Sequence, residues 1–195
     1  GHYHVKAHEW ESSGHANTWS RPASYAGGTC TSCHLGSGFI ADVDQGLNAS
    51  ETGNFPAHAD LENGVTQTCA TCHDPHNADN PHQLRFAGSV TLKATVPGQE
   101  GLVDYTADMG TAAMCAQCHN LRPGKDEAGK GIHHSHQTEM VLGIGGYHYP
   151  EESYSSGSHR HMTNVCTDCH MASPPRGSEK VLGSHSWRMH DDNDT

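Results

Sequence analysis

The sequence has few of the residues that build an ordinary hydrophobic core. Hydrophobic residues make up only 33% of the 195 residues and aromatic residues only 6%, whereas nearly half of a typical soluble domain is apolar. A chain of this composition buries too little side-chain surface to offset the conformational entropy that it loses on folding. We therefore expect something other than side chains to complete the core.

Basic residues and long apolar runs are also scarce. The chain has 11 Lys and Arg against 22 Asp and Glu, so its formal net charge is -11 with neutral His. This negative charge argues against nucleic acid as a partner and favours partners with basic surfaces. No apolar stretch approaches the roughly 20 residues that a membrane-spanning helix needs, so we expect no membrane span.

Glycine and proline, by contrast, are plentiful, with 22 and 9 residues. They favour loops over long helices and strands. The clearest regular element is the segment 90–96, which lies between Gly88 and Pro97 and alternates apolar with polar residues, as a β-strand does. We predict a mostly irregular, loop-rich fold with short α-helices and few β-strands, in a single domain over 1–195.

All eight cysteines fall in four copies of Cys-x-x-Cys-His. This spacing is typical of covalent c-type haem attachment, in which two thiols bond to the porphyrin and the following His binds the iron. The sequence predicts four haem c groups, attached to Cys30, Cys33, Cys69, Cys72, Cys115, Cys118, Cys166 and Cys169. The predicted proximal iron ligands are His34, His73, His119 and His170. A pair of zinc clusters is the alternative, but it does not explain the His after each second Cys.

Four haems in a chain of this length would be crowded. Dividing 195 residues by 4 leaves about 49 for each haem, which is too little protein to enclose each one separately. We therefore expect a haem-cored protein whose haems touch or nearly touch. Haem c is attached outside the cytoplasm, so we expect an exported protein, extracellular, periplasmic or at the cell surface. The start at Gly1, without a charged and apolar leader, fits a mature form.

Histidine is present in excess, because 19 His leave fifteen after the four proximal ligands. We predict bis-His ligation at all four sites. Met is the rival distal ligand, but Met114 and Met171 adjoin attachment motifs and cannot easily reach the far face of a haem. The candidates for distal ligands are His15, His58, His76, His134, His159 and His185. His76 stands only three residues after His73, so it fits a neighbouring haem better than its own.

Other histidines are not expected to bind iron, namely His2, His4, His8, His82, His148, His161 and His190. We interpret the first three as part of a solvated, flexible N-terminal arm, with binding of stray divalent metal as an alternative. The second ring nitrogen of each true ligand should donate to a carbonyl or carboxylate oxygen. Asn48 begins an Asn-x-Ser pattern, a weak signal for glycosylation.

Several segments resemble exported multihaem c-type cytochromes. They are the four attachment motifs, the run Cys72-His-Asp-Pro-His76, the segment from His134 to Met140 with Gly143–Gly146, the end Cys169-His-Met171 and the late His185-Ser-Trp187. Four haems in about 200 residues and a His-rich N-terminus are similar to the tetrahaem subunits of extracellular cytochrome filaments. The resemblance implies head-to-tail polymers in which an adjoining subunit can supply one distal His, here first of all His15. Some of these segments also occur in soluble periplasmic tetrahaem carriers.

The sequence therefore predicts electron transfer rather than enzymatic activity. An iron with two His ligands has no open position for a substrate, and closely spaced haems exchange electrons fast because tunnelling falls exponentially with distance. We expect a conductive extracellular filament whose partners are copies of itself, redox proteins or extracellular electron acceptors. A soluble periplasmic shuttle is the alternative. A multihaem reductase with one open haem, or a metal or haem store, has less support because all four motifs end in His.

Overall fold

The computed structural model describes residues 2–20, 31–44, 66–94, 96, 103–120, 135–144, 148–149, 151–155, 157–173 and 181–190. Of the residues given a role above, Cys30, Asn48, His58 and His134 lie outside this part of the chain. The chain divides into two compact units. Unit 1 joins Gly1–Arg85 to Cys166–Thr195, and unit 2 is Phe86–Val165. The single domain over 1–195 stays a prediction.

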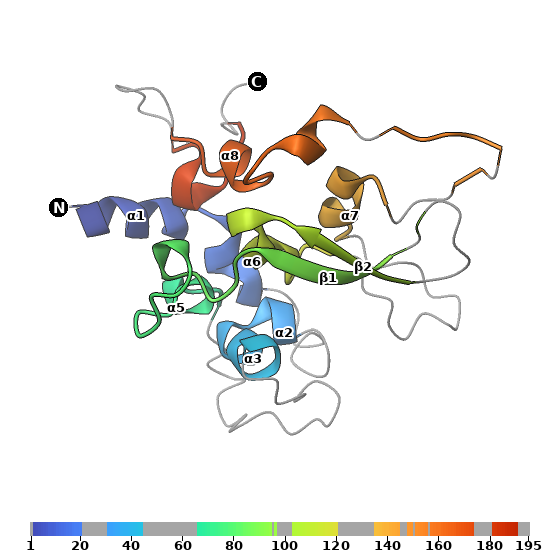
Figure 1. The fold of residues 1–195 in the computed structure, drawn as a ribbon. Helices are drawn as coiled ribbons and strands as arrows, with labels where there is room; N and C mark the ends of the chain where they lie inside the picture. The colour runs from blue at the N-terminus through green and yellow to red at the C-terminus, as the bar shows by residue number, and fades with distance from the viewer. Residues whose placement is uncertain are drawn as a thin grey trace. The chain divides into compact units, whose positions relative to one another are not determined.

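The described part of unit 1 consists of short helices and turns (Figure 1). In chain order these are α1 (His2–Glu11), the 3-10 helix η1 (Gly14–Ser20), α2 (Thr31–His34), α3 (Gly36–Phe39), the π-helical turn η4 (Ile40–Asp44), α5 (Cys69–Cys72), the 3-10 helix η6 (Pro81–Gln83), α8 (Thr167–His170) and the 3-10 helix η10 (Ser184–Ser186). Leu35 and Phe39 are buried beside the first motif. α1 packs on η10 and α3 on α5, so segments far apart in sequence hold this unit together.

The N-terminal segment is helical, so the prediction of a flexible arm is wrong. α1 includes the three N-terminal histidines, of which His8 is exposed. The carboxylate of Glu9 accepts a hydrogen bond of 3.3 Å from the backbone N–H of His185. The ammonium of Lys6 donates to the hydroxyl of Ser184. Most helical stability in proteins comes from tertiary contacts of this kind rather than from local propensity, which explains why the sequence pattern did not reveal this helix.

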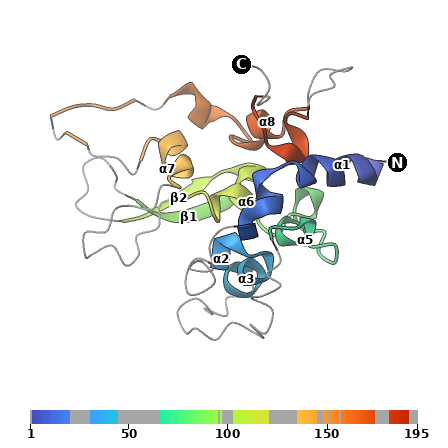
Figure 2. The same ribbon diagram turned by 180° about the vertical axis from the view of Figure 1, so that it is seen from behind.

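Unit 2 is built on a β-hairpin, which both views of the ribbon show (Figures 1 and 2). β1 (Ser89–Ala94) pairs antiparallel with β2 (Val103–Asp108). Val90 and Leu92 of β1 are buried, while Thr91 between them is exposed, as the two-residue period of a strand requires. The strand predicted at 90–96 is confirmed with slightly different bounds. Its partner within the chain, β2, was not predicted.

Short helices follow the hairpin in unit 2. They are the 3-10 helix η7 (Gly110–Ala112), α6 (Ala113–Ala116), α7 (Gln137–Leu142) and the 3-10 helix η9 (Ser158–His161). α7 ends at Gly143, whose φ of 70° is the left-handed conformation common after helices. The main chain and the hydroxyl of Thr138 in α7 both donate to the carbonyl of His119, at 3.1 and 2.6 Å. α7 is therefore fastened directly to the third attachment motif.

The described structure agrees with the predicted loop-rich fold of short helices and few strands. Its longest helix, α1, has 10 residues. Within the described ranges no helix is long and apolar enough to cross a membrane. Fourteen apolar residues are buried among the described residues, and five of them are alanines, at 41, 94, 112, 113 and 116. The others are Leu, Ile, Val, Met and Phe.

Candidate functional site

The attachment motifs that are described in full each form one helical turn. In the three motifs that are described in full, the backbone N–H of the His donates to the carbonyl of the first Cys, at 2.9 Å for His73, 2.9 Å for His119 and 2.8 Å for His170. In a helical turn, residues at i, i+3 and i+4 lie on one face. The Cys-x-x-Cys-His spacing thus directs two sulfurs and one imidazole to the same side. None of the seven described cysteines is in a disulfide.

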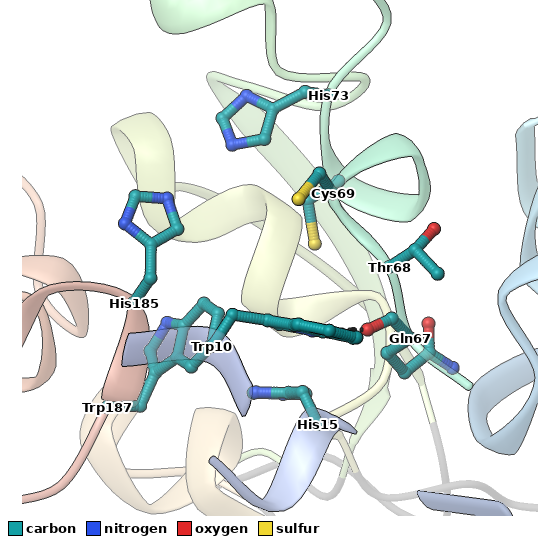
Figure 3. Close-up of a pocket in the computed structure, with 9 residues that line it drawn as sticks. Trp10, His15, Gln67, Thr68, Cys69, His73, His185 and Trp187 are labelled. Atoms are coloured by element: carbon teal, nitrogen blue, oxygen red, sulfur yellow. Dashed lines mark hydrogen bonds between the residues drawn. The ribbon is translucent and has the colours of Figure 1, made fainter. Parts of the chain in front are cut away.

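A pocket in unit 1 lies beside the second motif (Figure 3). It is partly open to solvent and is lined by Trp10, His15, Gln67, Thr68, Cys69, Cys72, His73, His185 and Trp187. In Figure 3 the ring of His73 and the sulfur of Cys69 lie on one side of this space, and the ring of His185 comes from the segment around η10. The pocket therefore combines an attachment motif with a histidine from the far end of the sequence.

The rings of His73 and His185 have a spacing that fits a shared metal ion. Their centres lie 6.2 Å apart and their planes are tilted by 32°. Two imidazoles that bind one ion from opposite sides, each through a metal–nitrogen bond of about 2 Å, have ring centres roughly 6 Å apart. The pair fits the two axial positions of one haem iron. Of the six distal candidates, His185 thus has the geometry for this role, which itself stays a prediction.

Two proximal histidines have the expected hydrogen bond from their second nitrogen. Nδ1 of His73 donates to the carbonyl of His82 at 2.8 Å. Nδ1 of His170 donates to the carbonyl of Trp187 at 3.2 Å. A proton held on Nδ1 leaves the lone pair on Nε2 for a metal, and such a partner also fixes the orientation of the ring. The predicted carbonyl partners are confirmed at these two motifs.

The surroundings of His185 favour its neutral form. Burial lowers the pKa of His185, the charges of Lys6 and His73 lower it further, and Glu9 opposes them. Nδ1 of His185 lies 3.9 Å from Oε2 of Glu9, too far for a hydrogen bond. Burial also acts on Glu9, whose pKa it raises. Hydrogen bonds from Ser184, Lys6 and the His185 backbone outweigh this and lower the pKa overall. Neutral imidazole is the form that binds metals.

The thiol of Cys72 is held in its uncharged form. Burial raises its pKa to about 11, with a further contribution from Cys69 and an opposing one from Arg85. Nε of Arg85 donates to the carbonyl of Ala70 at 2.9 Å, within the same motif.

Two tryptophans in the pocket had no role in the sequence analysis. Nε1 of Trp10 donates to the carbonyl of Gln67 at 2.7 Å, which ties α1 to the residues just before the second motif. The rings of Trp187 and His15 meet edge to face, with centres 4.4 Å apart. Trp187 stood in a segment that carried the resemblance, whereas nothing in the sequence pointed to Trp10. Large flat side chains are suitable walls for a large flat ligand.

The segments around the first and second motifs are in contact. The side-chain amide of Gln67 donates to the carbonyl of Cys33. A Cβ on Gly36, which directly opens α3, would lie 2.5 Å from Oγ1 of Thr71 and 2.8 Å from the carbonyl oxygen of Thr66. Only glycine allows α3 to approach α5 this closely. Any groups attached at these two motifs would be close neighbours.

The remaining distal candidates differ in their surroundings. His58 and His134 lie outside the described residues. His76 is exposed, and its backbone N–H bonds to the carboxylate of Asp74. His159 is exposed in η9. His15 lines the pocket of the second motif, so the structure brings together His15, His73 and His185 and places His76 and His159 at the surface.

His148 is a further candidate that the sequence analysis set aside. Both of its ring nitrogens are buried without a hydrogen-bond partner in the described structure. Its ring contacts the edge of Tyr154, with centres 5.0 Å apart. A buried polar atom normally has a partner, so two such atoms on one ring fit a ligand-binding histidine. It belongs to unit 2, as does the third motif. No sequence signal separated it from the other surplus histidines.

Comparisons with known proteins returned no match to a family model, a curated protein or a solved structure. Among the described residues, no three His, Cys, Asp or Glu side chains gather as the ligands of one metal ion. A haem iron takes only two protein ligands, so the pair His73 and His185 is a sufficient set.

Proposed function

We propose that this chain is a tetrahaem c-type cytochrome that transfers electrons through four bis-His haems. The observation that carries this proposal is the second motif, where Cys69 and Cys72 lie beside a pair of imidazoles 6.2 Å apart. The repetition of the motif extends the assignment to the other sites. Bound haem supplies an iron that takes up and releases one electron.

The residues of the chain would bind, orient and enclose the cofactor. The cysteines form thioether bonds, and the four motif histidines are proximal ligands. The carbonyls of His82 and Trp187 fix the rings of His73 and His170. His185 is the distal ligand at the second site, and His148, which lies in unit 2 with the third motif, is a distal candidate at the third. The low apolar content of the chain, with 33% hydrophobic residues, agrees with a fold whose interior is completed by the cofactors.

The proposed arrangement is a conduit without an open site for substrate, so we propose no enzymatic activity. Contact between the segments around the first two motifs supports close spacing of their haems, which electron transfer requires. We further propose that the chain is exported and forms an extracellular filament, with copies of itself, redox proteins or extracellular electron acceptors as partners. This assembly rests on the resemblance described above, and a soluble periplasmic shuttle is the other outcome of the test.

The experiment is production of the chain in a host that attaches haem c, followed by intact mass spectrometry and optical spectroscopy. We expect four covalently bound haems, low-spin spectra and no binding of carbon monoxide to the reduced protein. Electron microscopy of the same native material separates fibres from dispersed particles. Fewer than four haems, or a high-spin haem in the wild-type protein, would contradict the proposal.

A further inference from the structure

One turn near the end of the chain, Gly183–Arg188, contacts two attachment motifs. It contains η10, and φ is 61° at Gly183, 47° at Ser184 and 53° at Trp187. Residues other than glycine seldom adopt this left-handed region. Such conformations persist where surrounding contacts determine them, and they cluster at functional sites. The contacts of this turn with its surroundings therefore explain its three positive φ angles.

The first side of the turn faces the second motif. His185 points its ring toward that of His73, with a centre-to-centre distance of 6.2 Å. The indole of Trp187 lines the same pocket. The backbone N–H of His185 is held by the carboxylate of Glu9 at 3.3 Å, which fixes the distance between the turn and α1.

The second side of the turn faces the fourth motif. The carbonyl of Trp187 accepts the hydrogen bond from Nδ1 of His170 at 3.2 Å. The backbone of Gly183 lies so close to Ala172, two residues after His170, that a Cβ would overlap the carbonyl oxygen of Ala172. Glycine is thus required here both for the positive φ and for the close approach.

Internal hydrogen bonds make the turn a single rigid piece. The hydroxyl of Ser186 donates to the carbonyl of Gly183 at 2.7 Å, and Ser186 is only 2% exposed. The N–H of Gly183 donates to the carbonyl of Arg188 at 2.9 Å. Moving the end of the turn that touches the fourth motif would therefore also move His185 at the second motif.

We propose that the turn Gly183–Arg188 is a shared structural support that positions residues at both the second and the fourth haem site. His185 is the distal ligand at the second site, and Trp187 is a positioning residue whose carbonyl sets the ring of the proximal ligand at the fourth. This inference rests on the proposed function. It adds that the two sites respond together to a change in the turn, although their motifs are far apart in the sequence.

The test compares Gly183→Ala with Gly143→Ala in the haem-loaded protein. Both glycines have positive φ, 61° and 70°, but a Cβ on Gly143 would meet no atom within 4 Å. Cys69→Ser and Cys166→Ser backgrounds, each leaving one thioether and one free vinyl group, mark the absorption bands of the second and fourth haems. We expect Gly183→Ala to shift the reduction potentials of both marked haems and to weaken their low-spin signals. Gly143→Ala should shift neither.

A milder variant covers the case in which Gly183→Ala fails to fold. Ser186→Ala removes the internal hydrogen bond without adding an atom, and Thr91→Ala, which removes the 2.9 Å contact with Thr106 in the hairpin, is its control. We expect Ser186→Ala to shift both marked potentials in the same sense as each other. A shift in the reduction potential of only one marked haem would contradict the proposed shared support. Equal shifts in the control variant would contradict it as well. The proposed function fails separately, if the wild-type chain lacks four low-spin haems.

Discussion

Replacement of His185 by Ala tests the assignment of the second site most directly. The variant removes one of the two rings whose centres lie 6.2 Å apart. The wild-type protein should bind no carbon monoxide after reduction, because every iron has two protein ligands. The variant should bind about one molecule per chain, because one iron gains an open axial position. Titration of the reduced protein with carbon monoxide, followed in the haem absorption bands, gives this stoichiometry.

The amount of carbon monoxide that the variant binds depends on whether another histidine can replace His185 as a ligand. His15 lines the same pocket, but its ring is packed edge to face on Trp187 at 4.4 Å. In Figure 3 it lies on the other side of the Trp10 ring from His73. Reaching the iron would require both tryptophans to move, so we expect no substitution by His15. A double replacement of His15 and His185 should therefore bind no more carbon monoxide at the second site than the single variant.

Exposed His76 provides the matched control. It is the histidine nearest in sequence to the second motif after His73, and its backbone is held by Asp74. His76→Ala should leave carbon monoxide binding at zero if His76 is not a ligand. If His76→Ala binds carbon monoxide and His185→Ala binds none, the argument from the ring spacing is wrong. The role of distal ligand would then pass from His185 to His76.

Three other predictions concern the remaining sites. Gly36→Ala should lower the free energy of unfolding by roughly 1–3 kcal/mol through overpacking against Thr71, measured by denaturant titration against Gly14→Ala, whose Cβ would meet nothing within 4 Å. If the two buried nitrogens of His148 reflect binding to an iron, His148→Ala should open about one axial position per chain to carbon monoxide. A variant that binds no carbon monoxide would exclude His148 as a ligand. If His15 binds a haem of an adjoining subunit, as the resemblance implies, His15→Ala should abolish fibres seen by electron microscopy. Fibres that persist with unchanged low-spin spectra would exclude that role.

Local features of the fold were predictable where the sequence spacing alone determines them. The attachment motifs form helical turns because Cys69, Cys72 and His73 stand at i, i+3 and i+4, and the bond across the turn closes at 2.9 Å. β2 could also have been found, since Val103 and Tyr105 alternate with acidic and polar residues as in β1.

Long-range pairing could not be predicted in the same way. The spacing between His73 and His185 depends on the strained turn around η10 and on its contacts with Glu9, and none of these leaves a periodic signal. Surplus histidines are chemically identical in the sequence, so burial alone distinguishes His148 from exposed His76. The helix α1 could not be predicted for the same reason, because residues near the end of the chain stabilise it.

The contacts within unit 1 also bear on the order of the proposed haems. Gln67, just before the second motif, donates to the carbonyl of Cys33 in the first motif. The second motif is linked to the fourth through the turn that carries His185 and Trp187. Electron transfer between haems depends on distance and not on position along the chain. The second site would then be a junction between the first and the fourth. A change that disables it should interrupt transfer in both directions, whereas loss of the first site should leave exchange between the second and the fourth intact.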